Sequence, residues 1–119
     1  MLGSANRMIA KNVEWMLDAR DRTRGLLKYS EAPDSYAGIF KLPFLGILPI
    51  IHTFGMKFRI DIVYCDSYKR VIEIKKNIGP NRFVVPWKLL LGGARYAIEF
   101  SKADISDLSR GQKLEWLGS

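Results

Sequence analysis

Hydrophobic and polar residues alternate most clearly between Phe58 and Cys65. One side of this segment carries only apolar or aromatic residues, Phe58, Ile60, Ile62 and Tyr64. The other side mixes polar and apolar residues, Arg59, Asp61, Val63 and Cys65. A period of two is typical of a β-strand, because successive side chains point to opposite faces of the pleated backbone. We therefore predict that this segment is the central strand of the fold.

A second alternating run returns from Arg70 to Lys75, after the turn-forming residues Asp66–Lys69. Two such runs separated by a short polar turn predict an antiparallel β-hairpin. Uniform alternation predicts two faces for the second strand, with Val71, Glu73 and Lys75 on one and Ile72 and Ile74 on the other.

The remaining pattern predicts mostly short strands, over residues 9–17, 39–42, 83–85, 95–100 and 113–117. One short helix is predicted over Ala19–Leu27, because Asp18 is a good N-cap residue and good helix formers follow it. Asp104–Leu108 is expected to form a turn or a short helical segment. The predicted fold class is therefore mainly β, with α+β left open: a small antiparallel β-sandwich or barrel-like domain with one short N-terminal helix.

The chain length predicts a single domain over residues 1–119, with residues 1–8 expected to be flexible. Cys65 is the only cysteine, so no disulfide can form within the chain. The N-terminal residues lack a charged end followed by a sustained apolar run, which a secretory signal would need. We therefore expect a cytoplasmic protein.

The formal net charge of +7 is concentrated in the middle of the chain. Nine Lys or Arg residues lie between Lys41 and Lys88, against three acidic residues. Such a surplus can attract a phosphate backbone, and Tyr68, Phe83 and Trp87 are candidate stacking groups. A solvated basic surface is the more common reason for such charge, so nucleic-acid binding through residues 41–88 is an alternative and not the favoured function.

Between Lys41 and Lys57 lie fifteen residues without formal charge. This segment is too short for a transmembrane helix, which needs about 20 apolar residues, and Pro43 and Pro49 would interrupt a helix. It either covers the core or presents an apolar surface to a partner. Covering the core is favoured, and residues 42–56 are the first candidate for a contact surface if the protein binds a partner.

The order of the segments resembles a known family, the uncharacterised proteins grouped as domain of unknown function 192. Four segments carry the resemblance, namely residues 22–27 (RTRGLL), 52–64 (HTFGMKFRIDIVY), 70–72 (RVI) and 79–80 (GP). It extends over about residues 13–117. The resemblance implies a small, mainly antiparallel β domain of sandwich or barrel-like form with a helix near the N-terminus. It implies no established activity.

His52 and Asp61 are the sharpest candidates for chemistry. His52 is the only histidine, and its imidazole would serve as a general base if a carboxylate such as Asp61 oriented it. No complete catalytic motif surrounds the pair, so structural roles are favoured for both and the question of enzymatic activity stays open. His52 and Cys65 have no second pair of ligands, and the sequence predicts no metal and no cofactor.

The candidate ligand-binding residues are Arg22, His52, Thr53, Met56 and Asp61. Cys65 is expected to be a small buried residue and not a nucleophile, because nothing beside it favours the thiolate. The favoured function is a non-catalytic domain that binds a small ligand or a protein. The alternatives are a small enzyme that uses His52 with Asp61, and nucleic-acid binding through the basic middle of the chain. The sequence leaves the ligand and the oligomeric state open.

Overall fold

The computed structural model describes residues 1–4, 7–16, 29–41, 51–53, 55–84 and 93–116, with the backbone alone at 51–52 and 83–84. These residues form β-strands and no helix. The strands are β1 (Leu2–Ser4), β2 (Arg7–Ala10), β3 (Asn12–Met16), β4 (Tyr36–Lys41), β5 (Ile51–His52), β6 (Ile60–Asp66), β7 (Val71–Ile78), β8 (Phe83–Val84), β9 (Ala94–Ser101) and β10 (Leu114–Trp116). The mainly β class predicted from the sequence is confirmed.

The largest sheet has five strands in the order β3-β4-β9-β6-β7. All of its pairings are antiparallel except that of β3 with β4, which is parallel and which the sequence did not predict. β6 and β9 are central strands, and their near-continuous apolar residues allow burial on both faces. The strand predicted to be central from its alternation is therefore central in the sheet.

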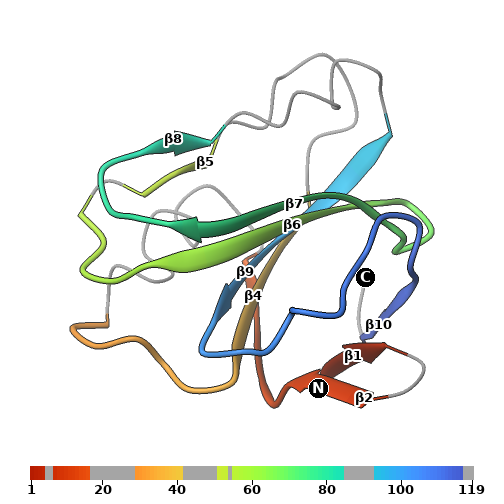
Figure 1. Cartoon of the computed structure of the whole chain (residues 1–119), viewed down its shortest axis with the longest axis horizontal. Coiled ribbons are helices and arrows are strands. Elements are labelled where there is room, and N and C mark those ends of the chain that lie inside the picture. Colours follow the sequence, from red (N-terminus) through yellow and green to blue (C-terminus); the bar gives the residue numbers. More distant parts are fainter. Residues whose placement is uncertain (5–6, 17–28, 42–50, 54, 85–92, 117–119) are drawn as a thin grey trace.

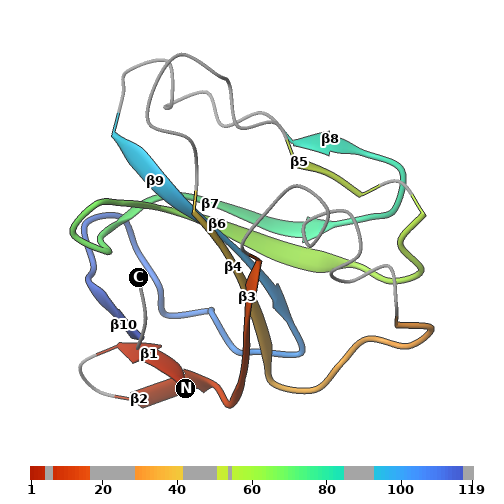
Figure 2. The ribbon, with the colours of Figure 1, turned by 180° about the vertical axis from the view of Figure 1, so that it is seen from behind.

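A smaller sheet of three strands, in the order β10-β1-β2, packs against one face of the large sheet. Leu2, Ala10 and Leu114 from the small sheet are fully buried. They belong to one apolar cluster with Val63 and Ile98 of the large sheet. Residues 1–8, expected from the sequence to be flexible, thus contain β1 and the start of β2. Figures 1 and 2 show this small sheet at the opposite end of the molecule from the β5–β8 pair.

The opposite face of the large sheet carries a second apolar cluster. Its buried members are Tyr36, Phe40, Met56, Ile60, Ile62, Tyr64, Ala94 and Ala97. Ile62 and Val63, although adjacent, contact different clusters, as the alternation along this strand predicts. One strand therefore anchors both halves of the core.

The β6–β7 hairpin is confirmed, but the alternation along β7 is interrupted. Cys65 pairs with Val71 and Tyr64 pairs with Glu73, so Ile72 is an extra residue in a β-bulge. The bulge places Val71 in the cluster that faces the small sheet and Ile72 against the other cluster. Ile74, however, packs against the same cluster as Val71, so the prediction that Ile72 and Ile74 share a face was wrong, because uniform alternation takes no account of a bulge.

The segment after β9 is a turn, in agreement with the turn expected at Asp104–Leu108. The Leu108 backbone N–H donates to the Ile105 carbonyl at 3.1 Å, and Asp104 Oδ1 accepts from the Ser106 backbone N–H at 3.0 Å. Arg7 of β2 donates from Nε to Asp107 Oδ2 at 2.9 Å and so ties this turn to the small sheet. The helix predicted over 19–27 lies outside the described residues, as does most of the 42–56 segment.

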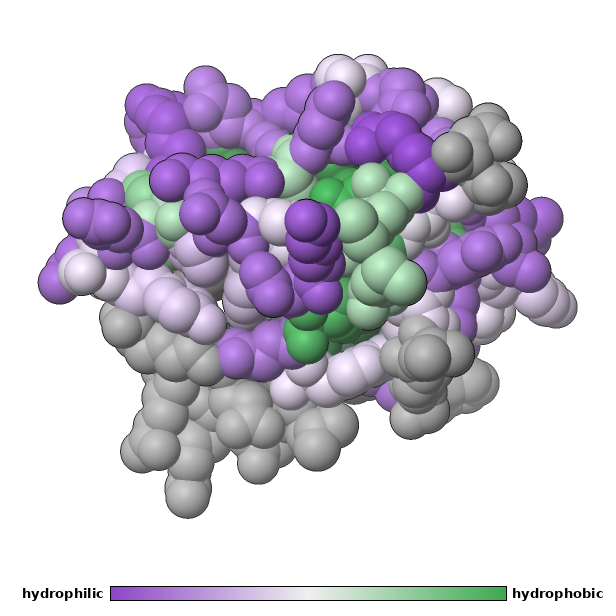
Figure 3. Space-filling model, turned by 90° about the horizontal axis from the view of Figure 1, so that it is seen from below, coloured by the Kyte–Doolittle hydropathy of each residue, from purple (hydrophilic) through white to green (hydrophobic). Residues whose placement is uncertain are grey.

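The surface seen from below is largely hydrophilic. Figure 3 shows hydrophobic side chains there in a narrow central band, bordered by hydrophilic residues. Large hydrophobic side chains that are exposed are few among the described residues: Met1, Met8 and Tyr68. In the described part of the chain, no helix is long and apolar enough to cross a membrane.

Close packing of β1 against β2 makes a glycine necessary at position 3. A Cβ atom there would lie 2.5 Å from the Arg7 carbonyl oxygen and 3.1 Å from Met8 Cα, and both are backbone atoms that cannot move cheaply. We expect Gly3→Ala to lower the free energy of unfolding by about 1–3 kcal/mol. Gly79→Ala is the matched control, because its Cβ would meet only the Arg59 guanidinium at 3.5 Å. Equal denaturation midpoints for the two variants and the parent would contradict this assignment.

Candidate functional site

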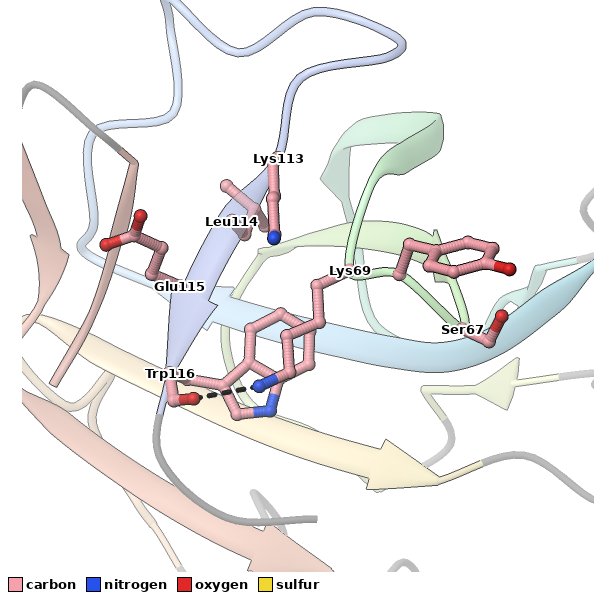
Figure 4. Close-up of a pocket in the computed structure, with 7 residues that line it drawn as sticks. Ser67, Lys69, Lys113, Leu114, Glu115 and Trp116 are labelled. Carbon is pink, nitrogen blue, oxygen red and sulfur yellow. Dashed lines mark hydrogen bonds between the residues drawn. The ribbon is translucent and has the colours of Figure 1, made fainter.

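A surface depression of about 380 Å³ lies between the β6–β7 turn and β10. Its lining residues are Ser67, Tyr68, Lys69, Lys113, Leu114, Glu115 and Trp116. Figure 4 shows the turn on one side of the depression and β10 on the other. The site therefore joins two segments that are far apart in the sequence.

The Asp66 carboxylate builds the turn. Asp66 Oδ1 accepts hydrogen bonds from the backbone N–H groups of Tyr68 at 2.8 Å and Arg70 at 2.9 Å. Asp66 Oδ2 accepts from Arg70 Nε at 3.0 Å. An Asp side chain that bonds to the backbone two residues later is a common means of fixing a tight turn. The turn predicted at Asp66–Lys69 is confirmed, and its carboxylate explains its shape.

Lys69 connects this turn to β10. Its backbone is in the left-handed region, with φ of 65°, and its carbonyl accepts a hydrogen bond from Leu114 N at 2.8 Å. Lys69 Nζ donates to the Trp116 carbonyl at 2.9 Å and lies 4.7 Å from the centre of the indole ring. This cation–π contact holds a half-buried ammonium group at the floor of the depression. An ammonium has three N–H donors, so the bond to Trp116 leaves others for a ligand.

Trp116 provides the apolar floor. The residue is 5% exposed, and its ring packs edge-on against Tyr96 with the ring centres 5.1 Å apart. Its indole Nε1–H is buried and has no hydrogen-bond acceptor among the residues that the structure describes. A buried donor without an acceptor costs about 1–3 kcal/mol.

The charges of the depression are arranged asymmetrically. Figure 4 shows Lys113 on the same side of β10 as Lys69, while the Glu115 carboxylate points to the other side of the strand. Lys113 is exposed and is held in place by a backbone bridge between Arg70 and Lys113. The side of the depression that faces the turn is therefore positive.

Thr53, a predicted ligand-binding residue, is fully buried and holds the chain after β7 in place. Its Oγ1 donates to the Gly79 carbonyl at 2.7 Å and accepts from the Arg82 backbone N–H at 2.9 Å. Its backbone N–H also donates to the Arg82 carbonyl at 2.8 Å. These contacts satisfy the hydroxyl inside the protein.

Asp61 has a similar supporting role. Its Oδ1 accepts from the Asn77 backbone N–H at 2.8 Å, and Asn77 has a positive φ of 57°. Arg59 Nη1 donates to the Asn77 carbonyl at 3.1 Å, so both side chains stabilise one irregular residue of β7. The described hydrogen bond of Asp61 is therefore to the backbone of the neighbouring strand β7.

The other predicted site residues do not join the depression in the described structure. Met56 is 7% exposed and belongs to the apolar cluster beneath β6. The backbone of His52 pairs with Phe83 in the β5–β8 ribbon, and its side chain lies outside the described part. Arg22 also lies outside the described residues. The joint role predicted for His52 and Asp61 therefore stays a prediction.

Cys65 is fully buried, and burial, followed by the nearby Asp66 carboxylate, raises the pKa of its thiol to about 12. The thiolate is the nucleophilic form, so a raised pKa makes this cysteine inert at neutral pH. Its packing agrees with the buried apolar role expected from the sequence.

Carboxylates also occur on the large sheet. Glu73 and Glu99 are buried, at 8% and 4% exposed, and Glu73 Oε1 lies 3.2 Å from Lys75 Nζ. Burial, followed by the Glu14 carboxylate, raises the pKa of Tyr36 far above its ordinary value.

Across the described ranges, no group of three or more His, Cys, Asp or Glu residues is placed to hold a metal ion.

The central residues of the depression, Lys69, Lys113 and Trp116, were not among the predicted site residues. A signal for them existed in the sequence, because the predicted hairpin places Lys69 at its turn and the predicted strand 113–117 contains both other residues. What the sequence did not indicate was that this last strand would lie beside that turn.

Fold and site together define a small, mainly β domain with a basic depression at the end of a hairpin. The family described as domain of unknown function 192 (DUF192), Uncharacterized ACR, matches residues 3–116 of this chain. The chain belongs to this family, as the resemblance of its central segments implied.

A UPF0127 protein of Thermococcus sibiricus is 36% identical over 98 residues, which cover 80% of this chain and 59% of that protein. The chain thus spans about three-fifths of the length of this relative. A Novosphingobium aromaticivorans protein of unknown function has a similar structure, with a TM-score of 0.71, 18% identity and coverage of 87% of this chain and 74% of the other.

A second solved structure belongs to a Sinorhizobium meliloti protein described as a candidate transcription regulator. Its TM-score is 0.73 with 17% identity, and the similarity covers 96% of this chain and 88% of the other. At these identities the likeness of both structures extends to the fold alone.

The two hydrogen bonds of the Thr53 hydroxyl make position 53 a test of structural function. Thr53→Val keeps the shape but leaves the Gly79 carbonyl and the Arg82 N–H without their partner, so we expect a loss of about 1–3 kcal/mol in the free energy of unfolding. Thr53→Ser keeps the hydroxyl and should retain most of that stability. Chemical denaturation compares the two, and a Val variant as stable as the Ser variant would refute the role.

Proposed function

We propose that this protein is a non-catalytic binding domain and that the depression between the β6–β7 turn and β10 binds an anionic group. The observation that carries the proposal is the meeting of two lysines, Lys69 and Lys113, in the lining of one depression that Trp116 also lines.

Electrostatics favour a negative ligand over a neutral one. Charge-assisted hydrogen bonds from lysine to an oxyanion are roughly twice as strong as neutral ones. The net charge of +7 adds a long-range attraction that raises the rate of encounter with anions. We therefore assign the binding function favoured from the sequence to this depression, and not to the 42–56 segment that was the first candidate.

The enzymatic alternative receives less support. In that alternative His52 is the general base and Asp61 orients it, whereas the described contact of Asp61 is the hydrogen bond that Oδ1 accepts from the Asn77 backbone N–H. Thr53, beside His52, is likewise committed to holding its neighbours. We therefore assign these two side chains to the support of β7 and of the chain that follows it.

Titration of the isotope-labelled protein with inorganic pyrophosphate at constant ionic strength tests the proposal. We expect chemical-shift changes at the amides of residues 67–69 and 113–116 and at the indole N–H of Trp116, with little change at the indole of Trp15. Replacing both lysines, Lys69→Gln with Lys113→Gln, should weaken binding at least about tenfold, because two charge-assisted hydrogen bonds are lost.

Lys102→Gln is the matched control, since Lys102 is 59% exposed and lies outside the lining of the depression. It removes one positive charge and should leave the affinity within about twofold of the parent. Shift changes spread over exposed lysines throughout the protein, or equal loss of affinity in the control, would refute an anion site at the depression.

A further inference from the structure

Tyr68 stands beside the proposed anion site and has an unusual exposure. It is 68% exposed, although large aromatic side chains in the described structure are otherwise mostly buried or half-buried. It lines the same depression as Lys69 and Lys113. An exposed aromatic ring beside cationic side chains is available to stack on a ligand with an apolar, flat part.

The surroundings of Tyr68 hold the ring ready for stacking. The guanidinium carbon of Arg70 lies 5.0 Å from the centre of the Tyr68 ring. Arg70 is itself fixed by Asp66, whose Oδ2 accepts from its Nε at 3.0 Å. The Tyr68 backbone N–H is bonded to Asp66 Oδ1, so the same carboxylate positions the backbone of the aromatic residue and its cationic neighbour.

We propose that the ligand of this depression is a nucleotide unit, with its base stacked on Tyr68 and its phosphate held by Lys69 and Lys113. This inference rests on the proposed anion site and adds the identity of the ligand. A base has the flat π face that stacks on tyrosine, and the adjacent phosphate has the charge that lysine binds. Aromatic rings interleaved with cations are the usual means by which proteins hold single-stranded nucleic acid.

The two groups that the depression would recognise, a base and the phosphate of the same nucleotide, occur both in free mononucleotides and in single strands. Fluorescence and calorimetric titrations with an oligothymidylate of about 12 nucleotides and with thymidine monophosphate distinguish the two sources. In a strand, several phosphates contribute and the affinity falls with increasing salt. We expect the oligonucleotide to bind, because the exposed Arg70 extends the positive surface beyond the phosphate held by Lys69 and Lys113.

Substitution of Tyr68 tests the stacking contact. Tyr68→Ala should weaken oligonucleotide binding at least about fivefold, whereas Tyr68→Phe keeps the ring and should stay within about twofold of the parent. Met8→Ala is a control on another surface, because Met8 is 42% exposed and lies on β2. Binding of inorganic pyrophosphate should be unaffected by Tyr68→Ala.

Each outcome has a definite meaning. The inference is supported if Tyr68→Ala weakens the binding of both the oligonucleotide and the mononucleotide while pyrophosphate binding stays intact. The one of the two that binds the parent protein more tightly then shows whether the ligand is a single strand or a free nucleotide. Unchanged nucleotide affinity in Tyr68→Ala overturns the inference while the anion site stands. No binding of pyrophosphate to the parent protein overturns the proposed function itself.

Discussion

The pairing of β6 with β9 is the interaction on which the rest of the structure depends. Ile62 and Val63 are both fully buried although they point to opposite faces, and Ile98 of β9 lies directly across from Val63. The large sheet therefore separates two apolar clusters and stabilises both. Its hydrogen bonds and its apolar side chains act together, because the buried backbone groups must be paired inside the protein.

The site follows from how β6 ends. Its last residue, Asp66, uses its carboxylate to fold the chain back into β7, and the resulting turn presents Lys69 with a positive φ to β10. The backbone bond from Leu114 to Lys69 and the ammonium over Trp116 then hold the small sheet against the hairpin. The Lys69 ammonium group therefore has both a structural role and the proposed binding role. Its bond to Trp116 uses one of its N–H donors, and the others can bind a ligand.

The local pattern of hydrophobic, polar and turn residues was sufficient to predict most of the strands and the β6–β7 hairpin, because alternation and turn residues act over a few positions. It was insufficient after Ile72, where a bulge puts Ile74 on the face opposite to Ile72, and for the parallel pairing of β3 with β4, since both depend on distant partners. Thr53 and Asp61 were predicted as ligand-binding candidates, and their described partners are backbone groups of the protein itself. Lys69 was missed as a site residue because its partners on β10 lie more than forty positions later.

The measurement that tests the central claim most directly is the pyrophosphate affinity of Asp66→Ala, read together with amide hydrogen exchange of β6 and β9. If the carboxylate shapes the turn that carries the donors, the variant should bind the anion at least about tenfold more weakly. The amides of the central strands should remain protected, because the core does not contain this carboxylate. Full anion affinity in Asp66→Ala would contradict the account, since the site would then form without the turn.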